Sequence, residues 1–325
     1  MSEPLCVSCG TNTNFKIVDY ENKWKHYLFD NLSIRVCEFC GLGSAFPEPE
    51  DFKLETYYLT EYRSLNSPMF IDFDLINMFD IGLKAQSQAA YILKHISVKS
   101  RKKDTYRGLD LGAGAGELLR QVSQNIPIKY SVVEKSSDAI EFYKKNGIEV
   151  YDDLFSLPHK FDLIQSSHVL EHISSSQIFG YLKALNEKLS DNGYMFIEVP
   201  NDDFRKGKFC ITADCQSSHL TFFSVDSLTE LLAKSGFKIL DISTSGNVRK
   251  KVSLDSSVSK APIIFTSSLK RKIGHIIKVA ANRLGLLRIY HKTKHFLSKP
   301  VIANSSEFKY GDNRDVIRVI CIKSC

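Results

Sequence analysis

Three glycines at every second position interrupt an apolar run in the segment LDLGAGAGELL, residues 109–119. The apolar residues before the glycines predict a buried strand, and the residues after them predict a helix. Because glycine has no Cβ, Gly112, Gly114 and Gly116 tolerate positive φ and let a ligand approach the backbone closely. A strand that turns through such a loop into a helix N-terminus predicts an α/β fold with a nucleotide-like ligand at the turn.

The register of the glycines excludes two common phosphate-binding loops. A dinucleotide fingerprint would place its last small residue at Glu117 or Leu119, and a P-loop requires a lysine after the glycines. The remaining pattern, D-x-G-x-G-x-G, begins at Asp110. A second apolar run, YSVV, ends in Glu134, about 20 residues beyond Gly114, where an acid can accept hydrogen bonds from both ribose hydroxyls. The alternative is an ordinary turn followed by a solvated acid.

At these positions the chain resembles the class I methyltransferases that use S-adenosylmethionine. Residues 161–173 are similar to that family's fourth strand and active-site turn, and residues 189–201 to its next turn and fifth strand. Residues 219–237 resemble the following passage from helix to strand, and residues 316–322 the closing strand. The resemblance implies an α/β, Rossmann-like sheet of seven mostly parallel strands, with S-adenosylmethionine as the cosubstrate.

The resemblance also implies a set of cosubstrate-binding residues: Asp110, Gly112, Gly114, Gly116, Glu134, Asp152, Asp153 and Ser167. Asp152 and Asp153 follow a predicted third strand, where the family often has a polar contact to the adenine amine, and the sequence does not choose between them. Ser166 and Ser167 end the predicted fourth strand. They are candidates for contacts with the methionine carboxylate or the adenosine, or they cap the turn.

Three histidines are candidates for the chemistry of the acceptor. Methyl transfer from a sulfonium is an in-line displacement that depends mainly on alignment, but a sugar hydroxyl must also lose its proton to a base or a metal. His172 is the first candidate, because sugar C-methyltransferases similar to this chain carry a base histidine at the matching place. His168 is expected to bind substrate or to neighbour the methionine moiety, and His219 to approach the acceptor. The alternative for each is a packed or capping imidazole.

Glu171 lies between two of these histidines in the sequence. On a helix it would point away from them, so we expect it to brace a loop. The order H-E-x-x-H is absent here, so catalytic zinc bound by His168 and His172 is not expected.

Four cysteines near the N-terminus form two C-x-x-C pairs: Cys6, Cys9, Cys37 and Cys40. Short alternating stretches separate the pairs, which predicts a zinc ribbon whose four thiolates fill a tetrahedral, structural site. Because so short a segment buries little apolar surface, metal binding would supply much of its folding free energy. The alternative is four unrelated reduced thiols. Cys210, Cys215 and Cys321 are expected not to bind metal.

We expect four parts in the chain: a zinc ribbon over residues 1–55, a helical connector over 56–105, a methyltransferase domain over 106–245 and 312–325, and a basic, partly helical insertion over 246–311. Some bacterial methyltransferases that modify sugars are similar to this arrangement, which implies that the ribbon helps to wall off the acceptor site. The connector tyrosines, Tyr57, Tyr58 and Tyr62, either line that site or pack between domains.

The net charge of +6 is unevenly distributed, because residues 246–300 hold thirteen Lys or Arg and a single acid, Asp255. Apolar residues at helical spacing between Leu269 and Leu287 predict an amphipathic helix with basic flanks. In the family's fold this insertion leaves from the ligand side of the sheet, so it is expected to overhang the active site. It would hold a diphosphate or lie against anionic lipid, or it is a solvated positive face.

Together these features predict a methyltransferase that acts on a carbohydrate, either a nucleotide-linked sugar or a cell-surface glycan, with a histidine general base. The acceptor would be a small molecule or a glycan, free or linked to phosphate or lipid, with peripheral membrane contact through residues 246–300. The sequence leaves open O-, N- or C-methylation and the oligomeric state.

Two other functions are weighed against this one. An RNA-modifying enzyme is less favoured, because the ribbon carries several acids and no aromatic residues interleave with the basic ones. A non-catalytic cosubstrate-binding module is less favoured because the glycine loop and Glu134 are intact. No run of about 18 apolar residues and no leader are evident, so we expect a cytoplasmic protein, with or without membrane association.

Overall fold

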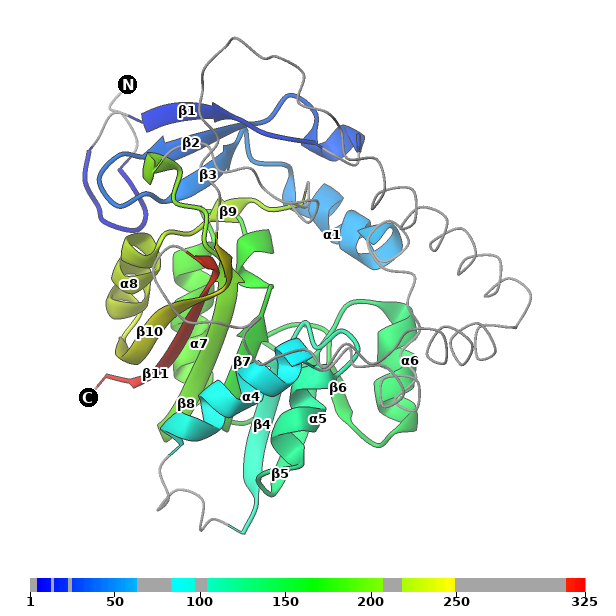
Figure 1. The fold of residues 1–325 in the computed structure, drawn as a ribbon. Helices are drawn as coiled ribbons and strands as arrows, with labels where there is room; N and C mark the ends of the chain where they lie inside the picture. The colour runs from blue at the N-terminus through cyan, green and yellow to red at the C-terminus, as the bar shows by residue number, and fades with distance from the viewer. Residues whose placement is uncertain are drawn as a thin grey trace, which may run out of the picture.

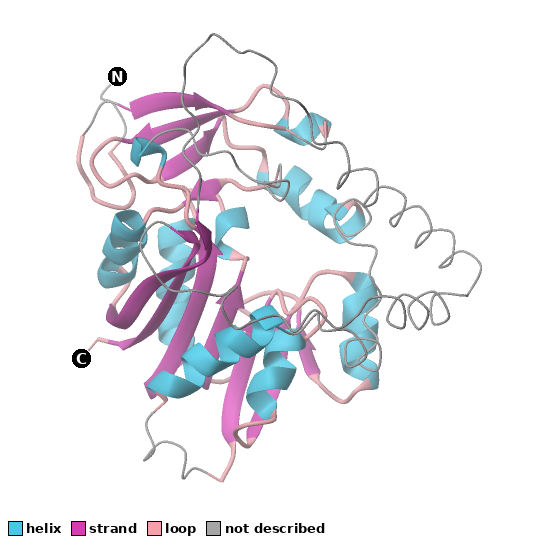
Figure 2. Ribbon diagram, in the orientation of Figure 1, coloured by secondary structure: helices cyan, strands magenta, loops and turns pink. Residues whose placement is uncertain are grey.

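The computed structural model describes residues 5–12, 15–22, 25–62, 83–96, 104–206, 218–248 and 314–324. The described strands form two sheets, one of seven strands and one of four. Helices pack against both faces of the larger sheet, and the smaller sheet lies beyond one end of its strands (Figure 1, Figure 2).

The larger sheet contains, in spatial order, β10 (Phe237–Val248), β11 (Arg314–Lys323), β8 (Leu189–Pro200), β7 (Phe161–Ser167), β4 (Tyr106–Leu111), β5 (Ile128–Val133) and β6 (Glu149–Tyr151). The strands from β8 to β6 pair in parallel, and β11 runs antiparallel to both of its neighbours. This order confirms the predicted Rossmann-like methyltransferase sheet of seven mostly parallel strands. The carboxyl ends of the parallel strands meet at one edge of the sheet, where ligands bind in such folds.

Apolar periodicity explains how the helices cover this sheet. In α7 (Ile178–Lys188) the buried residues Ile178, Leu182 and Leu185 recur at helical spacing, so one stripe of the helix faces the core. Successive residues of a strand point to opposite faces of the sheet. Val133 packs in the core under α7 and α8 (Val225–Lys234), and Val132 packs in a second core on the other face of the sheet. That second core is covered by α4 (Leu83–His95), α5 (Glu117–Ser123) and α6 (Ser137–Lys145).

The chain leaves the larger sheet at the end of β10 and returns at the start of β11. The predictions of an amphipathic helix, a basic surface and a membrane contact within residues 246–311 therefore fall almost wholly outside the described residues, as do those for Cys210 and Cys215. No helix in the described ranges combines the length and the apolar character that a membrane crossing requires.

The smaller sheet is assembled from distant parts of the sequence. Three of its strands, β1 (Phe15–Asp19), β2 (Ser33–Cys37) and β3 (Gly43–Phe46), form antiparallel hairpins within the predicted ribbon. The fourth, β9 (Thr221–Phe222), is distant from the other three in the sequence and pairs with β3. Sequence analysis did not foresee this strand. Helix α1 (Asp51–Thr60) follows β3 and buries Leu54 and Tyr57.

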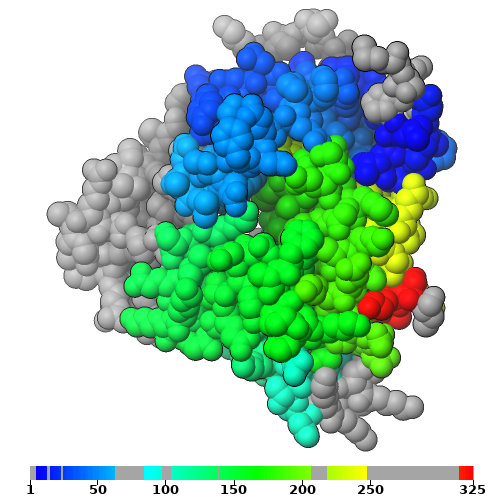
Figure 3. All heavy atoms as spheres, turned by 180° about the vertical axis from the view of Figure 1, so that it is seen from behind, coloured from blue at the N-terminus to red at the C-terminus, as the bar shows by residue number. Residues whose placement is uncertain are grey.

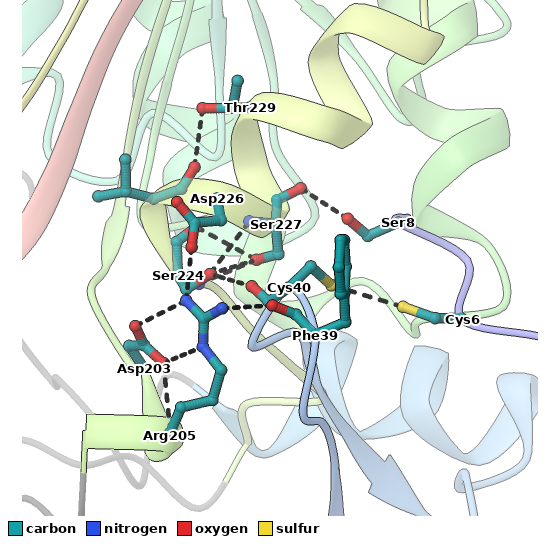
Figure 4. Close-up of polar contacts among 11 residues, drawn as sticks. Cys6, Ser8, Phe39, Cys40, Asp203, Arg205, Ser224, Asp226, Ser227 and Thr229 are labelled. Atoms are coloured by element: carbon teal, nitrogen blue, oxygen red, sulfur yellow. Dashed lines mark hydrogen bonds and ion pairs between the residues drawn. The ribbon is translucent and has the colours of Figure 1, made fainter. Parts of the chain in front are cut away.

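Hydrogen bonds fasten the N-terminal part to the start of α8 (Figure 4). Ser224 and Ser227 form a reciprocal capping box, in which each hydroxyl accepts the other residue's backbone N–H at 3.0 and 2.9 Å. The Ser224 hydroxyl also donates to the carbonyl of Cys40 at 2.5 Å, and the Ser8 hydroxyl donates to the carbonyl of Ser227 at 3.0 Å. The two cysteine turns therefore dock on one helix cap.

An arginine ties the second cysteine turn to the same region (Figure 4). The Arg205 guanidinium donates to the carbonyl of Phe39 at 2.5 Å and to the carboxylates of Asp203 and Asp226 at 2.8 and 2.7 Å. Seen from behind, the N-terminal residues in blue rest directly on the residues in green from the larger sheet and its helices (Figure 3).

Replacing the serine at the centre of this docking tests its contribution to stability. Ser224→Ala removes the helix cap and leaves the buried carbonyl of Cys40 without its donor, so we expect a loss of about 2 kcal/mol in unfolding free energy, measured by urea denaturation. Thr229→Ala is the control on the same helix. Within the described part of the chain its hydroxyl donates only to the carbonyl of Val225, so its loss should stay below about 0.5 kcal/mol. Equal losses in the two variants would contradict the docking role.

Candidate active site

A cavity of about 510 Å³ opens at the carboxyl ends of β4, β5, β6 and β7 and extends to the side chains of α1. The predicted site residues that line it are Gly112, Gly114, Glu134, Asp152, Asp153, His168 and His172. Tyr58 and Tyr62 line it from the α1 side. Asp110, Gly116, Ser167 and His219 are not among its lining residues.

The glycine loop has a backbone that other residues adopt poorly. Gly112, Gly114 and Gly116 have φ of +58°, +57° and +70°, all in the left-handed region. A Cβ on Gly112 would also lie 2.7 Å from Cγ2 of Val169, closer than van der Waals contact permits. Every second position of this loop has a positive φ, which explains why glycine recurs at that spacing. The loop leads directly into α5.

Glu134 is held by backbone donors at the end of β5. Its Oε1 accepts hydrogen bonds from the N–H groups of Lys135 and Ser136, both at 3.0 Å, and its Oε2 accepts one from Gly114 at 3.2 Å. The carboxylate therefore connects the glycine loop to the next strand and lies at the cavity wall.

Asp110 lies beneath the loop instead of at the cavity surface. The Gln165 amide donates to its Oδ2 at 2.7 Å, and the Tyr130 hydroxyl donates to the Gln165 carbonyl oxygen at 2.9 Å. Burial raises the pKa of Asp110 to about 7, although the hydrogen bond from Gln165 acts in the opposite direction. This position lets Asp110 support the loop from below.

The two aspartates after β6 differ in their contacts. Asp153 accepts the backbone N–H of Ser156 at 2.7 Å and so stabilises its own turn, whereas Asp152 makes no side-chain hydrogen bond to the described residues. Of the two serines that end β7, Ser167 accepts a hydrogen bond from the Gln88 amide at 2.8 Å, and Ser166 is fully buried with its hydroxyl unpaired among the described residues.

His168 is clamped between two buried carboxylates. Its Nδ1 lies 3.0 Å from Glu171 Oε1 and its Nε2 lies 3.1 Å from Glu198 Oε1. Because carboxylates only accept, both nitrogens donate and the ring is an imidazolium. Burial and the charge of Lys84 act to lower the pKa of His168, but the two hydrogen bonds outweigh them and raise it to about 8. The ring is therefore a fixed cation and a poor proton acceptor.

The contact with Glu171 corrects one expectation. Glu171 was expected to point away from the histidines, but residues 170–172 form a single 3-10 turn, and its carboxylate binds His168 directly. His168 itself has φ of +57°, which is rare for a residue with a side chain. Its backbone N–H donates to the carbonyl of Glu198 at 2.9 Å, which helps to hold this conformation.

His172 presents a neutral imidazole to the cavity. Its Nδ1 lies 3.1 Å from the carbonyl oxygen of Ser218, so Nδ1 carries the proton and Nε2 keeps its lone pair. Burial lowers the pKa of His172, and the charge of Glu171 opposes this effect only in part. The ring centroid lies 5.7 Å from that of Tyr58 and 5.6 Å from that of Tyr62.

His219 lies behind His172, with 5.0 Å between the ring centroids. The side chain is buried, and burial followed by the neighbouring His172 lowers the pKa of His219 to about 3, so this ring is also neutral. The structure thus brings the three predicted histidines to one side of the cavity, around Glu171.

Sequence reasoning missed the charged residues that support His168. Glu198 of β8 is fully buried and accepts hydrogen bonds from Arg318 at 2.5 Å and from Gln88 at 2.8 Å, besides its ion pair with Lys84 at 3.0 Å. The signal in the sequence was a single charged residue in each of two otherwise apolar strands: Glu198 in FIEVP and Arg318 in VIRVICI. Such residues are buried only when they are paired.

The four predicted metal-binding cysteines lie together and form no disulfide. Cys6 Sγ lies 3.6 Å from Cys40 Sγ, and Cys9 Sγ lies 3.7 Å from Cys37 Sγ. Sulfur atoms bound tetrahedrally to zinc at about 2.3 Å lie about 3.8 Å apart, so these separations fit such an ion. The four sulfurs lie within 4.8 Å of one another, and the site can accept a metal with little adjustment.

Comparisons with known proteins agree with the fold. A family model described as "Methyltransferase domain" matches residues 83–242. No curated protein matches the chain.

Three solved structures represent the similar folds. An S-adenosylmethionine-dependent methyltransferase from Clostridium acetobutylicum ATCC 824 is 13% identical with a TM-score of 0.44, over 76% of this chain and 94% of that chain. One from Archaeoglobus fulgidus is 20% identical with a TM-score of 0.42, over 74% and 94%. The 1,6-didemethyltoxoflavin-N1-methyltransferase from Burkholderia thailandensis, bound to 1,6-didemethyltoxoflavin and S-adenosylhomocysteine, is 16% identical with a TM-score of 0.45, over 68% and 90%.

The family match spans both the glycine loop and the histidine turn. Residues 83–242 are a methyltransferase domain, and the chain is an S-adenosylmethionine-dependent methyltransferase.

Proposed function

We propose that the chain transfers the methyl group of S-adenosylmethionine to a carbohydrate, either a nucleotide-linked sugar or a glycan. The observation that carries this proposal is that a single cavity connects the glycine loop and Glu134 with His172, Tyr58 of α1 and the nearby Tyr62. The donor and the acceptor can therefore lie in one enclosed space, as in-line transfer requires.

The cosubstrate would bind along the ends of β4, β5 and β6. Gly112 and Gly114 let its amino-acid and ribose parts approach the backbone, and the fixed carboxylate of Glu134 accepts the ribose hydroxyls. Asp152 is the better partner for the adenine amine, because Asp153 is already engaged with Ser156. Asp110 acts by supporting the loop from below, and Ser167 by fixing Gln88.

The acceptor would bind between the histidine turn and α1. The rings of Tyr58 and Tyr62 can pack against the C–H face of a sugar, while Ser174 and Gln177 offer polar groups at the same wall. A phosphate or an anionic lipid linked to the sugar would be attracted by the positive charge of residues 246–300.

Removal of the acceptor's proton would depend on His172. Its neutral ring, with Nδ1–H fixed on the carbonyl of Ser218, leaves Nε2 as a basic lone pair at the cavity. His168 is the less suitable base because its two carboxylate partners keep it protonated. His168 would instead hold the carboxylates of Glu171 and Glu198 beside the acceptor site.

We further propose that the four cysteines bind a structural zinc ion. Thiolates in a closed tetrahedral set leave no position for substrate, and the two cysteine turns are docked on the cap of α8. Zinc here would stabilise the wall of the cavity that α1 provides, since α1 follows the same sheet.

Glu134→Gln tests the cosubstrate site. Loss of charge-assisted hydrogen bonds to the ribose should weaken S-adenosylmethionine binding about 10- to 100-fold, measured by calorimetry on the full chain. Glu149→Gln is the matched control, because Glu149 pairs with Lys129 on an exposed surface away from the cavity. Unchanged affinity in Glu134→Gln would remove this residue from the proposed role.

His172→Ala tests the acceptor side. We expect methyl transfer to fall by at least about 100-fold while S-adenosylmethionine affinity is retained. Nucleotide-sugars, glycan lipids and RNA are the acceptors, and the methyl donor is radiolabelled. The exposed His159→Ala should behave as wild type. Undiminished turnover in His172→Ala would exclude the role, and methylation of RNA alone would exclude a carbohydrate acceptor.

Metal analysis tests the cysteine site. About one zinc per chain should survive dialysis against EDTA, because a closed thiolate site holds its ion tightly. The double variant Cys37→Ser, Cys40→Ser should lose this zinc and unfold at lower temperature. Cys321→Ala, which alters a buried thiol in β11, should retain it. A wild-type chain that is folded and free of metal after dialysis would contradict the proposal.

A further inference from the structure

A second group of metal-ligand side chains lies beside the cavity, apart from the cysteines, and one of its members, His172, lines the cavity. Glu171, His172 and His219 each have one ligand atom within 4.8 Å of the others. They come from η4 (Leu170–His172) and from the segment before β9. Hydrogen bonds join these segments: the Leu220 N–H donates to the carbonyl of Glu171 at 2.7 Å, and the Thr221 hydroxyl donates to the carbonyl of Ile173 at 2.6 Å.

Two atoms of this group are buried and have no hydrogen-bond partner among the residues that the structure describes. They are Oε2 of Glu171 and Nδ1 of His219, in residues that are 1% and 6% exposed. An unsatisfied buried carboxylate oxygen is costly, so its presence beside an unsatisfied imidazole nitrogen indicates a missing ligand. A cation can accept electron pairs from the carboxylate oxygen and from the imidazole nitrogen at once.

The surrounding residues orient the three side chains for such a ligand. The Nδ1–H of His172 donates to the carbonyl of Ser218 at 3.1 Å, which leaves Nε2 available. His168 donates to the other oxygen of Glu171, Oε1, at 3.0 Å. Backbone carbonyls on ligating histidines and hydrogen bonds on ligating carboxylates are the usual outer partners of metal ligands.

The donor atoms of the three side chains also suit a cation. Glu171 supplies a carboxylate oxygen and the two histidines supply one imidazole nitrogen each, and these atoms lie within 4.8 Å of one another.

We propose that Glu171, His172 and His219 bind a divalent first-row transition-metal ion that keeps open coordination positions toward the cavity. Two imidazoles and one carboxylate form a three-residue set that leaves positions for water or substrate. Ligand atoms about 2.1 Å from an ion lie about 3 to 4 Å apart, so small side-chain rotations close the site.

The metal's role in catalysis rests on the proposed function, whereas its binding does not. An acceptor hydroxyl bound to the cation becomes more acidic. Its O–H bond breaks and the proton passes to solvent, the oxygen lone pair forms the new bond to the methyl carbon, and the C–S bond breaks with its electron pair on sulfur. In the metal-bound state His172 thus acts as a ligand and takes part in proton removal through the ion.

Cobalt binding tests the site in the full chain after the cysteines have been loaded with zinc. Thiolates give Co²⁺ intense charge-transfer absorption that nitrogen and oxygen ligands lack, so the visible spectrum separates the two sites. We expect about one Co²⁺ per chain with a nitrogen and oxygen spectrum. His219→Ala and Glu171→Gln should each weaken its binding at least about 10-fold, and His95→Gln, which alters a histidine paired with Asp241, should leave it unchanged.

Retained S-adenosylmethionine binding shows that each variant is folded. Absence of this Co²⁺ spectrum in the wild-type chain would overturn the proposal, and so would equal binding in His219→Ala. Methylation of a carbohydrate without Co²⁺ binding would contradict the proposed metal site but support the proposed function. Co²⁺ binding without carbohydrate methylation would contradict the proposed function but support the metal site.

Discussion

The carboxylate of Glu198 is the contact on which the histidine side of the cavity depends. It lies fully buried on β8 and is surrounded by cations and donors from β11, α4 and the turn after β7. Burial alone would raise its pKa, but the nearby charges of Lys84, His168 and Arg318 hold it well below its usual value. Removing one partner of such a network leaves an uncompensated buried charge, which is strongly destabilising. The same network holds the His168 ring from both sides and so stabilises the positive-φ backbone at that residue.

Much of the larger sheet could be predicted from the sequence, because apolar runs and glycines report directly on burial and backbone conformation. Gly112, Gly114 and Gly116 have positive φ as their spacing implied, and Glu134 lies beside the loop as its distance from Gly114 implied. The histidine turn was harder to predict. Whether Glu171 faces the histidines depends on the difference between a 3-10 turn and an α-helix, which periodicity over so few residues does not resolve. Two partners of Glu198, Arg318 and Gln88, lie more than 100 residues from it in the sequence, and no local pattern encodes them.

The two proposed metal sites are chemically different, and one segment of the chain contributes to both of them. The cysteines form a closed, soft thiolate set behind the cap of α8, whereas Glu171, His172 and His219 form an open set of nitrogen and oxygen ligands at the cavity. The segment from Ser218 to Ser227 contributes to both: it contains His219, then β9, then the capping serines that dock the cysteine turns. We therefore expect a change that loosens the cysteine turns from the capping serines also to displace His219, because both belong to this segment.

The pairing of β3 with β9 also has a consequence for how the chain is made. Gly43 pairs with Phe222, so the edge of the N-terminal hairpins emerges 179 residues before its partner. At roughly 5 to 20 residues per second, that edge has no strand beside it for roughly 10 to 35 s during synthesis. An open strand edge is a template for incorrect pairing with other chains. A ribbon that binds its metal early would be kept compact during this interval, so metal supply during translation would affect the yield of folded protein.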